Sequence, residues 1–86
     1  MRPSIDVAMK SAAEAYNDKV IGVLLSGMGK DGAEGMKAIK EKGGKTIAQD
    51  ELTSVIFGMP KAAIDAGVVD KVASLPDIVD EIIRML

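Results

Sequence analysis

The chain has 86 residues, a formal net charge of −2 and 48% hydrophobic residues, which suffices for one small domain and excludes a disordered tail. It contains neither cysteine nor histidine, which excludes disulfides and thiol nucleophiles and removes the commonest general base and zinc ligand. With no tryptophan, one tyrosine and one phenylalanine, it lacks the aromatic platforms and positive groove of a protein that binds single-stranded nucleic acid.

The longest apolar runs, such as 20–25, are far shorter than the about 20 residues that a membrane-spanning helix needs. The first four residues, 1–4, lack the apolar stretch of a signal peptide. We therefore expect no membrane insertion and a cytoplasmic location.

The first half of the chain alternates between helical and strand patterns. Residues 20–25 form a continuous apolar run, which predicts a parallel strand covered on both faces. A glycine-rich loop follows, and residues 33–42 again have a helical pattern that Gly43 and Gly44 end. Before the strand, apolar residues recur at helical spacing behind Ser4, a residue type that caps helices: Ile5, Ala8, Met9, Ala12 and Tyr16.

The middle of the chain continues the alternation. Residues 46–49 predict a second strand, and residues 50–54 a loop. Residues 55–57 fit either a short strand or a buried turn, and the pattern does not decide between them. Pro60 suits the first turn of a helix over 60–67, and residues 68–72 predict a third strand.

The end of the chain predicts a helix. Ser74 and Asp77 have the spacing of a capping box. The alternation as a whole predicts an α/β fold: about half of a doubly wound parallel sheet, with three strands and four helices. One apolar stripe follows the capping residues: Leu75, Ile78, Val79, Ile82, Ile83 and Leu86.

The loop 26–32, between the first strand and the next helix, is the candidate site. Ligands of open α/β sheets bind at the carboxyl ends of strands. Gly27, Gly29 and Gly32 literally match G-x-G-x-x-G, with Asp50 about 20 residues further on, which is the pattern of a dinucleotide-binding half-domain. Asp31 opposes that interpretation, because its carboxylate would face a pyrophosphate of the same charge.

Asp31 has two further interpretations. Its carboxylate is suited to orient a histidine from another segment, as in a catalytic triad. It is equally suited to cap the helix that begins at Ala33, in which case the loop is structural and the domain has no ligand.

Four ordered segments resemble the C-terminal part of the catalytic domain of CheB-type protein-glutamate methylesterases. The resemblance covers nearly all of residues 1–86, and its segments are Arg2–Val7, Ser26–Gly35, Thr46–Glu51 and Phe57–Pro60.

The resemblance implies a serine hydrolase on a doubly wound α/β domain. Such enzymes demethylate glutamate methyl esters on methyl-accepting chemotaxis receptors and deamidate certain glutamines, under the control of a receiver domain. By the resemblance, Asp31 is the aspartate of a Ser-His-Asp triad, and Met28 donates its backbone N–H to the oxyanion. No metal and no organic cofactor is implied.

The serine and histidine motifs of the family precede the region that this chain resembles. We therefore expect residues 1–86 to be the C-terminal half of a methylesterase-like catalytic domain, without the N-terminal half and the receiver domain. We expect the chain alone to be inactive as an esterase. Half of a parallel sheet has an unpaired edge and uncovered apolar surface, so we also expect it to self-associate.

Overall fold

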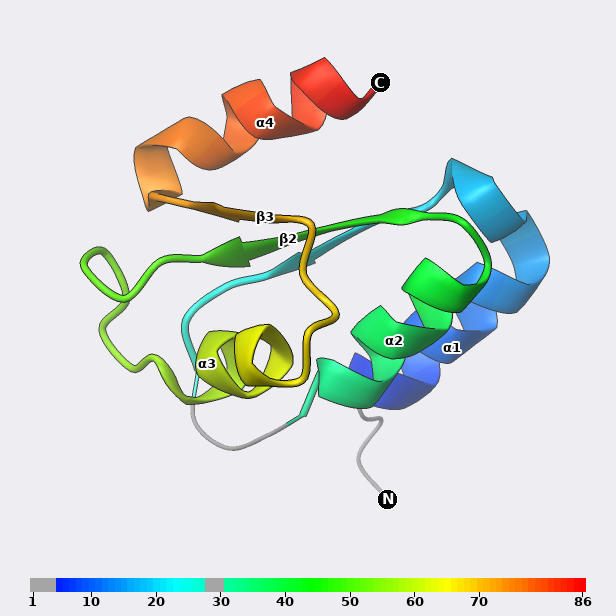
Figure 1. Cartoon of the computed structure of the whole chain (residues 1–86), viewed down its shortest axis with the longest axis horizontal. Helices are drawn as coiled ribbons and strands as arrows, with labels where there is room; N and C mark the ends of the chain where they lie inside the picture. The colour runs from blue at the N-terminus through cyan, green and yellow to red at the C-terminus, as the bar shows by residue number, and fades with distance from the viewer. Residues whose placement is uncertain (1–4, 28–30) are drawn as a thin grey trace.

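The structure, a computed structural model, describes residues 5–27 and 31–86. These residues form four α-helices, two short 3-10 helices and three strands, and helices alternate with strands along the chain (Figure 1). The α-helices are α1 (Ile5–Tyr16), α2 (Ala33–Glu41), α3 (Gly58–Asp65) and α4 (Ile78–Met85), the 3-10 helices are η1 (Asn17–Lys19) and η2 (Leu75–Asp77), and the strands are β1 (Ile21–Leu24), β2 (Lys45–Gln49) and β3 (Lys71–Ala73).

The three strands form a parallel sheet in the order β1-β2-β3. Ile21 of β1 lies opposite Lys45 of β2, and Ile47 of β2 lies opposite Lys71 of β3. The parallel α/β arrangement predicted from the sequence is therefore confirmed. Gly43 (φ +88°) and Gly67 (φ +75°) both have the left-handed conformation with which helices commonly end.

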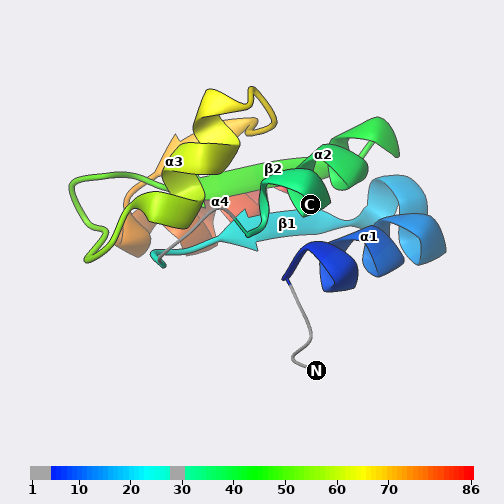
Figure 2. The same cartoon turned by 90° about the horizontal axis from the view of Figure 1, so that it is seen from below.

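Helices cover both faces of the sheet. In Figure 1, α2 and α3 lie below the strands and α4 lies above them, and Figure 2 shows α1 on the β1 side of α2. Leu24, Met36 and Ala63 form the core under α2 and α3. On the opposite face, Ile47 and Ala73 pack against Ile78 of α4, and the described buried residues thus form a separate core on each side.

The structure differs from the sequence-based expectation in the loop after β2. Residues 55–57 are neither a strand nor a buried turn, because Val55 (93% exposed) and Ile56 form an exposed bend and Phe57, after it, is half-buried. The third strand also begins later than predicted, at Lys71 instead of residue 68.

The terminal helix differs as well. The Ser74 hydroxyl donates to the Asp77 side chain (2.9 Å) and accepts no hydrogen bond from a backbone N–H of the helix, so the predicted capping box is wrong. The predicted apolar stripe is divided in two. Ile78 is buried against the sheet, while Val79 and Ile83 are more than 60% exposed.

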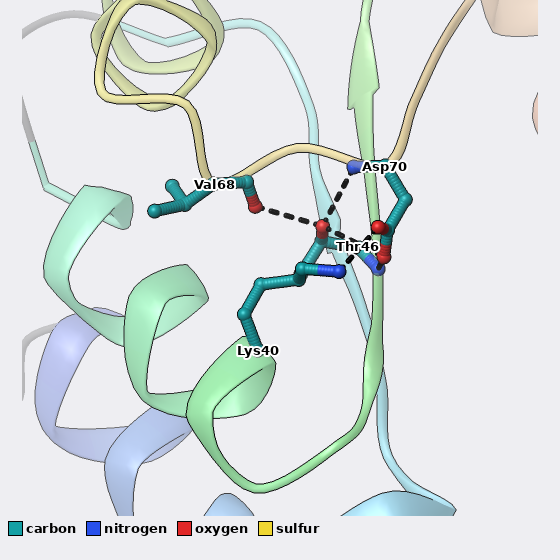
Figure 3. Close-up of polar contacts among 4 residues, drawn as sticks. All are labelled: Lys40, Thr46, Val68 and Asp70. Atoms are coloured by element: carbon teal, nitrogen blue, oxygen red, sulfur yellow. Dashed lines mark hydrogen bonds and ion pairs between the residues drawn. The ribbon is translucent and has the colours of Figure 1, made fainter.

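Asp70, between α3 and β3, joins three elements at the amino-terminal end of β2 (Figure 3). Its carboxylate accepts a hydrogen bond from the Thr46 backbone N–H (2.9 Å) and forms an ion pair with Lys40 of α2. The Thr46 hydroxyl in turn donates to the Val68 carbonyl (2.8 Å) and accepts from the Asp70 N–H (2.9 Å). These bonds explain the late start of β3, because Val68 and Asp70 bind the Thr46 side chain.

We expect Asp70→Asn to reduce stability at neutral pH by about 1 kcal/mol and to weaken the loss of stability in acid. Desolvation raises the pKa of the Asp70 carboxyl, but the Lys40 ammonium and the Thr46 N–H together outweigh it, so the pKa lies below 3.8. Because the folded-state pKa is depressed, this stabilisation is present above about pH 4 and is lost as the pH falls through the folded-state pKa.

Urea unfolding at pH 7 and pH 3 measures this effect. Asp65→Asn is the matched control, because Asp65 pairs with Lys61 while both side chains are more than 60% exposed. The control should unfold like the wild type at both pH values. If Asp70→Asn lost as much stability in acid as the wild type, the Asp70 carboxylate would not contribute to the acid sensitivity of the domain.

Candidate functional site

The loop after β1 leads directly into α2 at the carboxyl end of the sheet. Gly32 precedes α2 with φ +104°, a conformation that side chains with a Cβ rarely adopt. A Cβ at this position would also lie 2.6 Å from the Leu24 side chain. The glycine therefore lets the chain turn tightly against the end of β1. This turn fixes the backbone position of its neighbour, Asp31.

The Asp31 carboxylate lies at the amino-terminal end of α1. Its two oxygens accept hydrogen bonds from the backbone N–H groups of Ile5 (2.8 Å) and Asp6 (3.2 Å). The interpretation that Asp31 caps its own helix is therefore wrong, because the helix that it caps is α1.

Asp6 completes a reciprocal arrangement between the two helices. One oxygen of its carboxylate accepts hydrogen bonds from the backbone N–H groups of Gly32 (2.9 Å) and Gly35 (2.7 Å), in the first turn of α2. Helix α1 also packs closely on α2 here. A Cβ at Gly35 would lie only 2.6 Å from the Met9 Cβ, so the glycine is what allows this approach. Each aspartate thus satisfies the free N–H groups of the other's helix, and the backbone beside Asp31 is held in place.

These contacts keep Asp31 ionised. The hydrogen bond from the Ile5 N–H lowers the pKa of its carboxyl most, desolvation opposes it, and the contacts with Asp6 and Gly32 lower the pKa further. The net pKa lies below 3.8, so Asp31 is a carboxylate at neutral pH. A carboxylate offers about four acceptor positions, so two backbone donors leave capacity for another N–H donor.

Met28, the predicted oxyanion donor, lies outside the described residues. The residues just before it are described, and three hydrogen bonds hold them. The Ser26 N–H donates to Oε1 of Gln49 (2.8 Å), and the Gly27 N–H donates to the Ile56 carbonyl (2.8 Å). The Met59 N–H donates to the Gly27 carbonyl (2.9 Å). Segment 49–59 therefore fixes the first part of the loop.

Gln49 is a residue that the sequence analysis did not single out. Its one local signal is an amide side chain at the end of an apolar strand, where the Ile47 and Ala48 side chains are buried. That signal predicts that the amide is hydrogen-bonded, because buried polar groups usually are. It does not identify the partner, because Ser26 is 23 residues away in sequence.

Asp50, the acid of the dinucleotide-binding pattern, is bonded within its own loop. Oδ1 of its carboxylate accepts hydrogen bonds from the Thr53 N–H (3.0 Å) and the Thr53 hydroxyl (2.6 Å) within its own loop. Within residues 5–27 and 31–86, no three histidine, cysteine, aspartate or glutamate side chains are grouped to hold a metal. Across the same described ranges, no helix is long and apolar enough to span a membrane.

Comparison with known proteins identifies the family. Residues 1–82 match the family model of the CheB methylesterase. The chain is 69% identical over 80 residues to protein-glutamate methylesterase/protein-glutamine glutaminase 1 of Carboxydothermus hydrogenoformans. The matched region covers 93% of this chain and 24% of that protein. A protein-glutamate methylesterase/protein-glutamine glutaminase of Archaeoglobus fulgidus is 50% identical over 86 residues, covering 100% of this chain and 25% of the relative.

The crystal structure of the Thermotoga maritima CheB methylesterase catalytic domain has the same fold. It superposes with a TM-score of 0.96 at 44% identity, over 99% of this chain and 45% of that domain. The chain spans about a quarter of the length of the curated relatives it matches. The resemblance inferred from the four sequence segments is thereby confirmed, and the chain belongs to the CheB methylesterase family.

Proposed function

We propose that this chain contributes the aspartate-bearing half of a serine hydrolase site, in which Asp31 orients a histidine supplied by another segment. Two of the relatives are named protein-glutamate methylesterase/protein-glutamine glutaminase. The proposed reactions are therefore hydrolysis of glutamate methyl esters and deamidation of glutamines, on chemotaxis receptors. In this proposal the backbone N–H of Met28 stabilises the oxyanion.

The observation that carries the proposal is the state of Asp31. Its carboxylate is ionised, held by the Ile5 and Asp6 N–H groups, and placed in the loop at the carboxyl end of β1. This combination fits the aspartate of a triad, which must present a fixed acceptor to the Nδ1–H of an imidazole.

In the proposed mechanism the histidine takes the proton of the serine hydroxyl as that oxygen attacks the ester carbonyl. The imidazole then carries a positive charge, which the Asp31 carboxylate stabilises without accepting the proton itself. The lowered pKa of Asp31 supports this role, because a weakly basic carboxylate leaves the proton on the imidazole. The imidazolium gives this proton to the leaving group as the bond from the carbonyl carbon breaks, which releases methanol from a methyl ester or ammonia from a glutamine and leaves a serine ester. Water then attacks that ester with the neutral histidine as general base, and the histidine returns the proton to the serine oxygen as the free glutamate carboxyl leaves.

Complementation tests the proposal. The chain is mixed with the serine- and histidine-bearing segment of the Carboxydothermus hydrogenoformans relative, and methanol release from a methylated receptor is measured. We expect the complex to be active and each segment to be inactive alone, because Asp31 has nothing to orient without the histidine. If that segment alone released methanol as fast as the complex, the proposed role of this chain would be wrong.

We also propose that the free edge of β1 receives a further strand of the catalytic domain. Among the described residues, β1 pairs with β2 on one side alone. Without that strand, the chain should self-associate through this edge. Sedimentation velocity should show a dimer or larger species that the complementary segment converts to a 1:1 complex, whereas a monomer at all concentrations would contradict the proposal. In the whole protein we place the reaction in the cytoplasm under the control of a receiver domain.

A further inference from the structure

Asp6, in the first turn of α1, contacts the segment that carries Asp31 twice, in opposite directions. Its backbone N–H donates to Oδ1 of Asp31 (3.2 Å). Oδ1 of its own carboxylate accepts the N–H of Gly32 (2.9 Å), the residue that directly follows Asp31. The two hydrogen bonds therefore close a ring, which runs from the Asp31 carboxylate through Asp6 and back to the Asp31 backbone.

The ring restricts the rotation of the Asp31 side chain. An aspartate side chain otherwise turns about two single bonds, and within the ring neither rotation is possible unless a hydrogen bond breaks. The second oxygen is fixed separately, because Oδ2 accepts the Ile5 N–H (2.8 Å). The acceptor positions that these donors leave free therefore point in a fixed direction, as the orienting acceptor of a histidine N–H requires.

Gly35 allows the backbone of Asp6 to lie close to α2. Its N–H donates to Oδ1 of Asp6 (2.7 Å). A Cβ on Gly35 would lie 2.6 Å from the Met9 Cβ and 3.2 Å from the Asp6 Cα, and neither atom is the flexible end of a side chain. The position of Asp6 relative to α2 thus depends on this glycine as well as on the Asp6 carboxylate. Each of the two can be changed by substitution while the other is retained.

We infer that Asp6 is a positioning residue for the hydrolysis, whose carboxylate fixes the direction in which Asp31 presents its free acceptor positions to the histidine. The inference rests on the proposed function. A misplacement of about 1 Å costs about 100-fold in rate. Because both N–H groups are accepted by one oxygen of Asp6, the role needs a single acceptor and not a negative charge. Asp6 acts through Asp31, which orients the histidine, so its loss should lower kcat and leave KM little changed.

Three variants test the inference in the complex with the serine- and histidine-bearing segment, with kcat calculated per active site titrated with a serine-directed reagent. We expect Asp6→Ala to lower kcat by about 10- to 100-fold. Asp6→Asn should restore most of kcat, because its amide oxygen accepts both N–H groups. Gly35→Ala should also lower kcat, although the Asp6 carboxylate is intact, because the added methyl group displaces the start of α1 from α2.

Two matched controls lie at the amino-terminal end of β2, away from Asp31. Asp70→Ala removes a carboxylate that likewise joins two elements, since it accepts the Thr46 backbone N–H (2.9 Å). Gly44→Ala places a Cβ 2.6 Å from the Ile39 side chain and 2.7 Å from the Val20 carbonyl oxygen. Both controls should lower stability, and with it the fraction of active sites, while kcat per site stays unchanged.

Hydrogen exchange of the Ile5 amide gives a readout on this chain alone that needs no activity. This N–H donates to Oδ2 of Asp31, so its exchange reports whether the carboxylate is held in place. The inference predicts faster exchange of Ile5 in Asp6→Ala and Gly35→Ala than in Asp70→Ala. Equal rates in the three variants would contradict it.

Wild-type kcat in Asp6→Ala would overturn the inference. A loss in Asp6→Asn as large as in Asp6→Ala would overturn it as well, because the charge of Asp6 would then matter and not its acceptor geometry. Asp31→Asn tests the proposed function separately. An inactive Asp31→Asn beside a fully active Asp6→Ala would support the proposed function and remove the inference, whereas full activity in Asp31→Asn would overturn both.

Discussion

Replacement of Asp31 by asparagine should lower kcat of the complemented complex by about 10⁴-fold, with the fold retained. The asparagine is the same size as the aspartate, but it presents an NH₂ group where the carboxylate presents an acceptor. The imidazole then favours the wrong tautomer and loses the negative charge that stabilises its protonated form. The measurement is methanol release from a methylated receptor by the complex, with kcat calculated per titrated serine.

Asp6→Asn separates this catalytic effect from a loss of helix capping. Both aspartates cap a helix, but a single oxygen of Asp6 accepts the N–H groups of Gly32 and Gly35, so the amide oxygen of an asparagine retains that pattern. Asp31 uses both of its oxygens, and its replacement by asparagine costs one of the two cap bonds at the start of α1. Asp6→Asn should therefore retain most of kcat, and an equal loss in both variants would assign the effect of Asp31→Asn to the helix termini.

The contribution of Asp31 to stability depends on pH. The pKa of Asp31 is depressed in the folded chain, so its contribution to stability is present above about pH 4 and is lost as the pH falls through the folded-state pKa. At neutral pH the wild-type carboxylate is ionised both as a helix cap and beside the histidine, so the comparison of kcat per titrated site with Asp6→Asn assigns the defect to the missing charge.

The elements that the sequence predicted correctly depend on short-range patterns. The apolar run before Ser26 predicted β1, and the structure places the strand at Ile21–Leu24 within it. Gly43 and Gly67 predicted helix ends, and both have the positive φ that a left-handed residue requires there. The position of the loop at the carboxyl end of β1 followed from the same alternation, because parallel strands joined by helices place such loops along one edge of the sheet.

The contacts of the site depend on residues far apart in sequence. Asp31 is 26 residues from Ile5, and its type alone is compatible with capping either α1 or α2. Gln49 is 23 residues from Ser26, and nothing local to Gln49 indicates that partner. The helical period likewise predicts that α4 is amphipathic, but it does not determine which of Ile78 and Val79 faces the sheet. These choices are made by tertiary packing, which the sequence pattern does not specify.

The largest effect on stability should come from Ile47→Ala, for which we expect a loss of about 2–5 kcal/mol. Ile47 lies in the central strand, is 0% exposed, and packs with Ala73 and Ile78 in the core under α4. The loss combines the transfer of buried apolar surface with the cavity that remains, because the β2 backbone is bonded to strands on both sides and cannot collapse into the space. Small domains have a total stability of about 5–15 kcal/mol, so the variant should lie close to unfolding.

Urea unfolding of Ile47→Ala and Leu52→Ala gives the comparison. The Leu52 side chain is 92% exposed in the loop after β2, and its truncation should change the free energy of unfolding by less than about 0.5 kcal/mol. Because β2 pairs with β1, the strand that leads to Asp31, unfolding of β2 should also release the loop that carries Asp31. We therefore expect Ile47→Ala to reduce the fraction of active sites and not kcat per site. Equal unfolding midpoints in the two variants would show that this core does not determine the stability of the sheet.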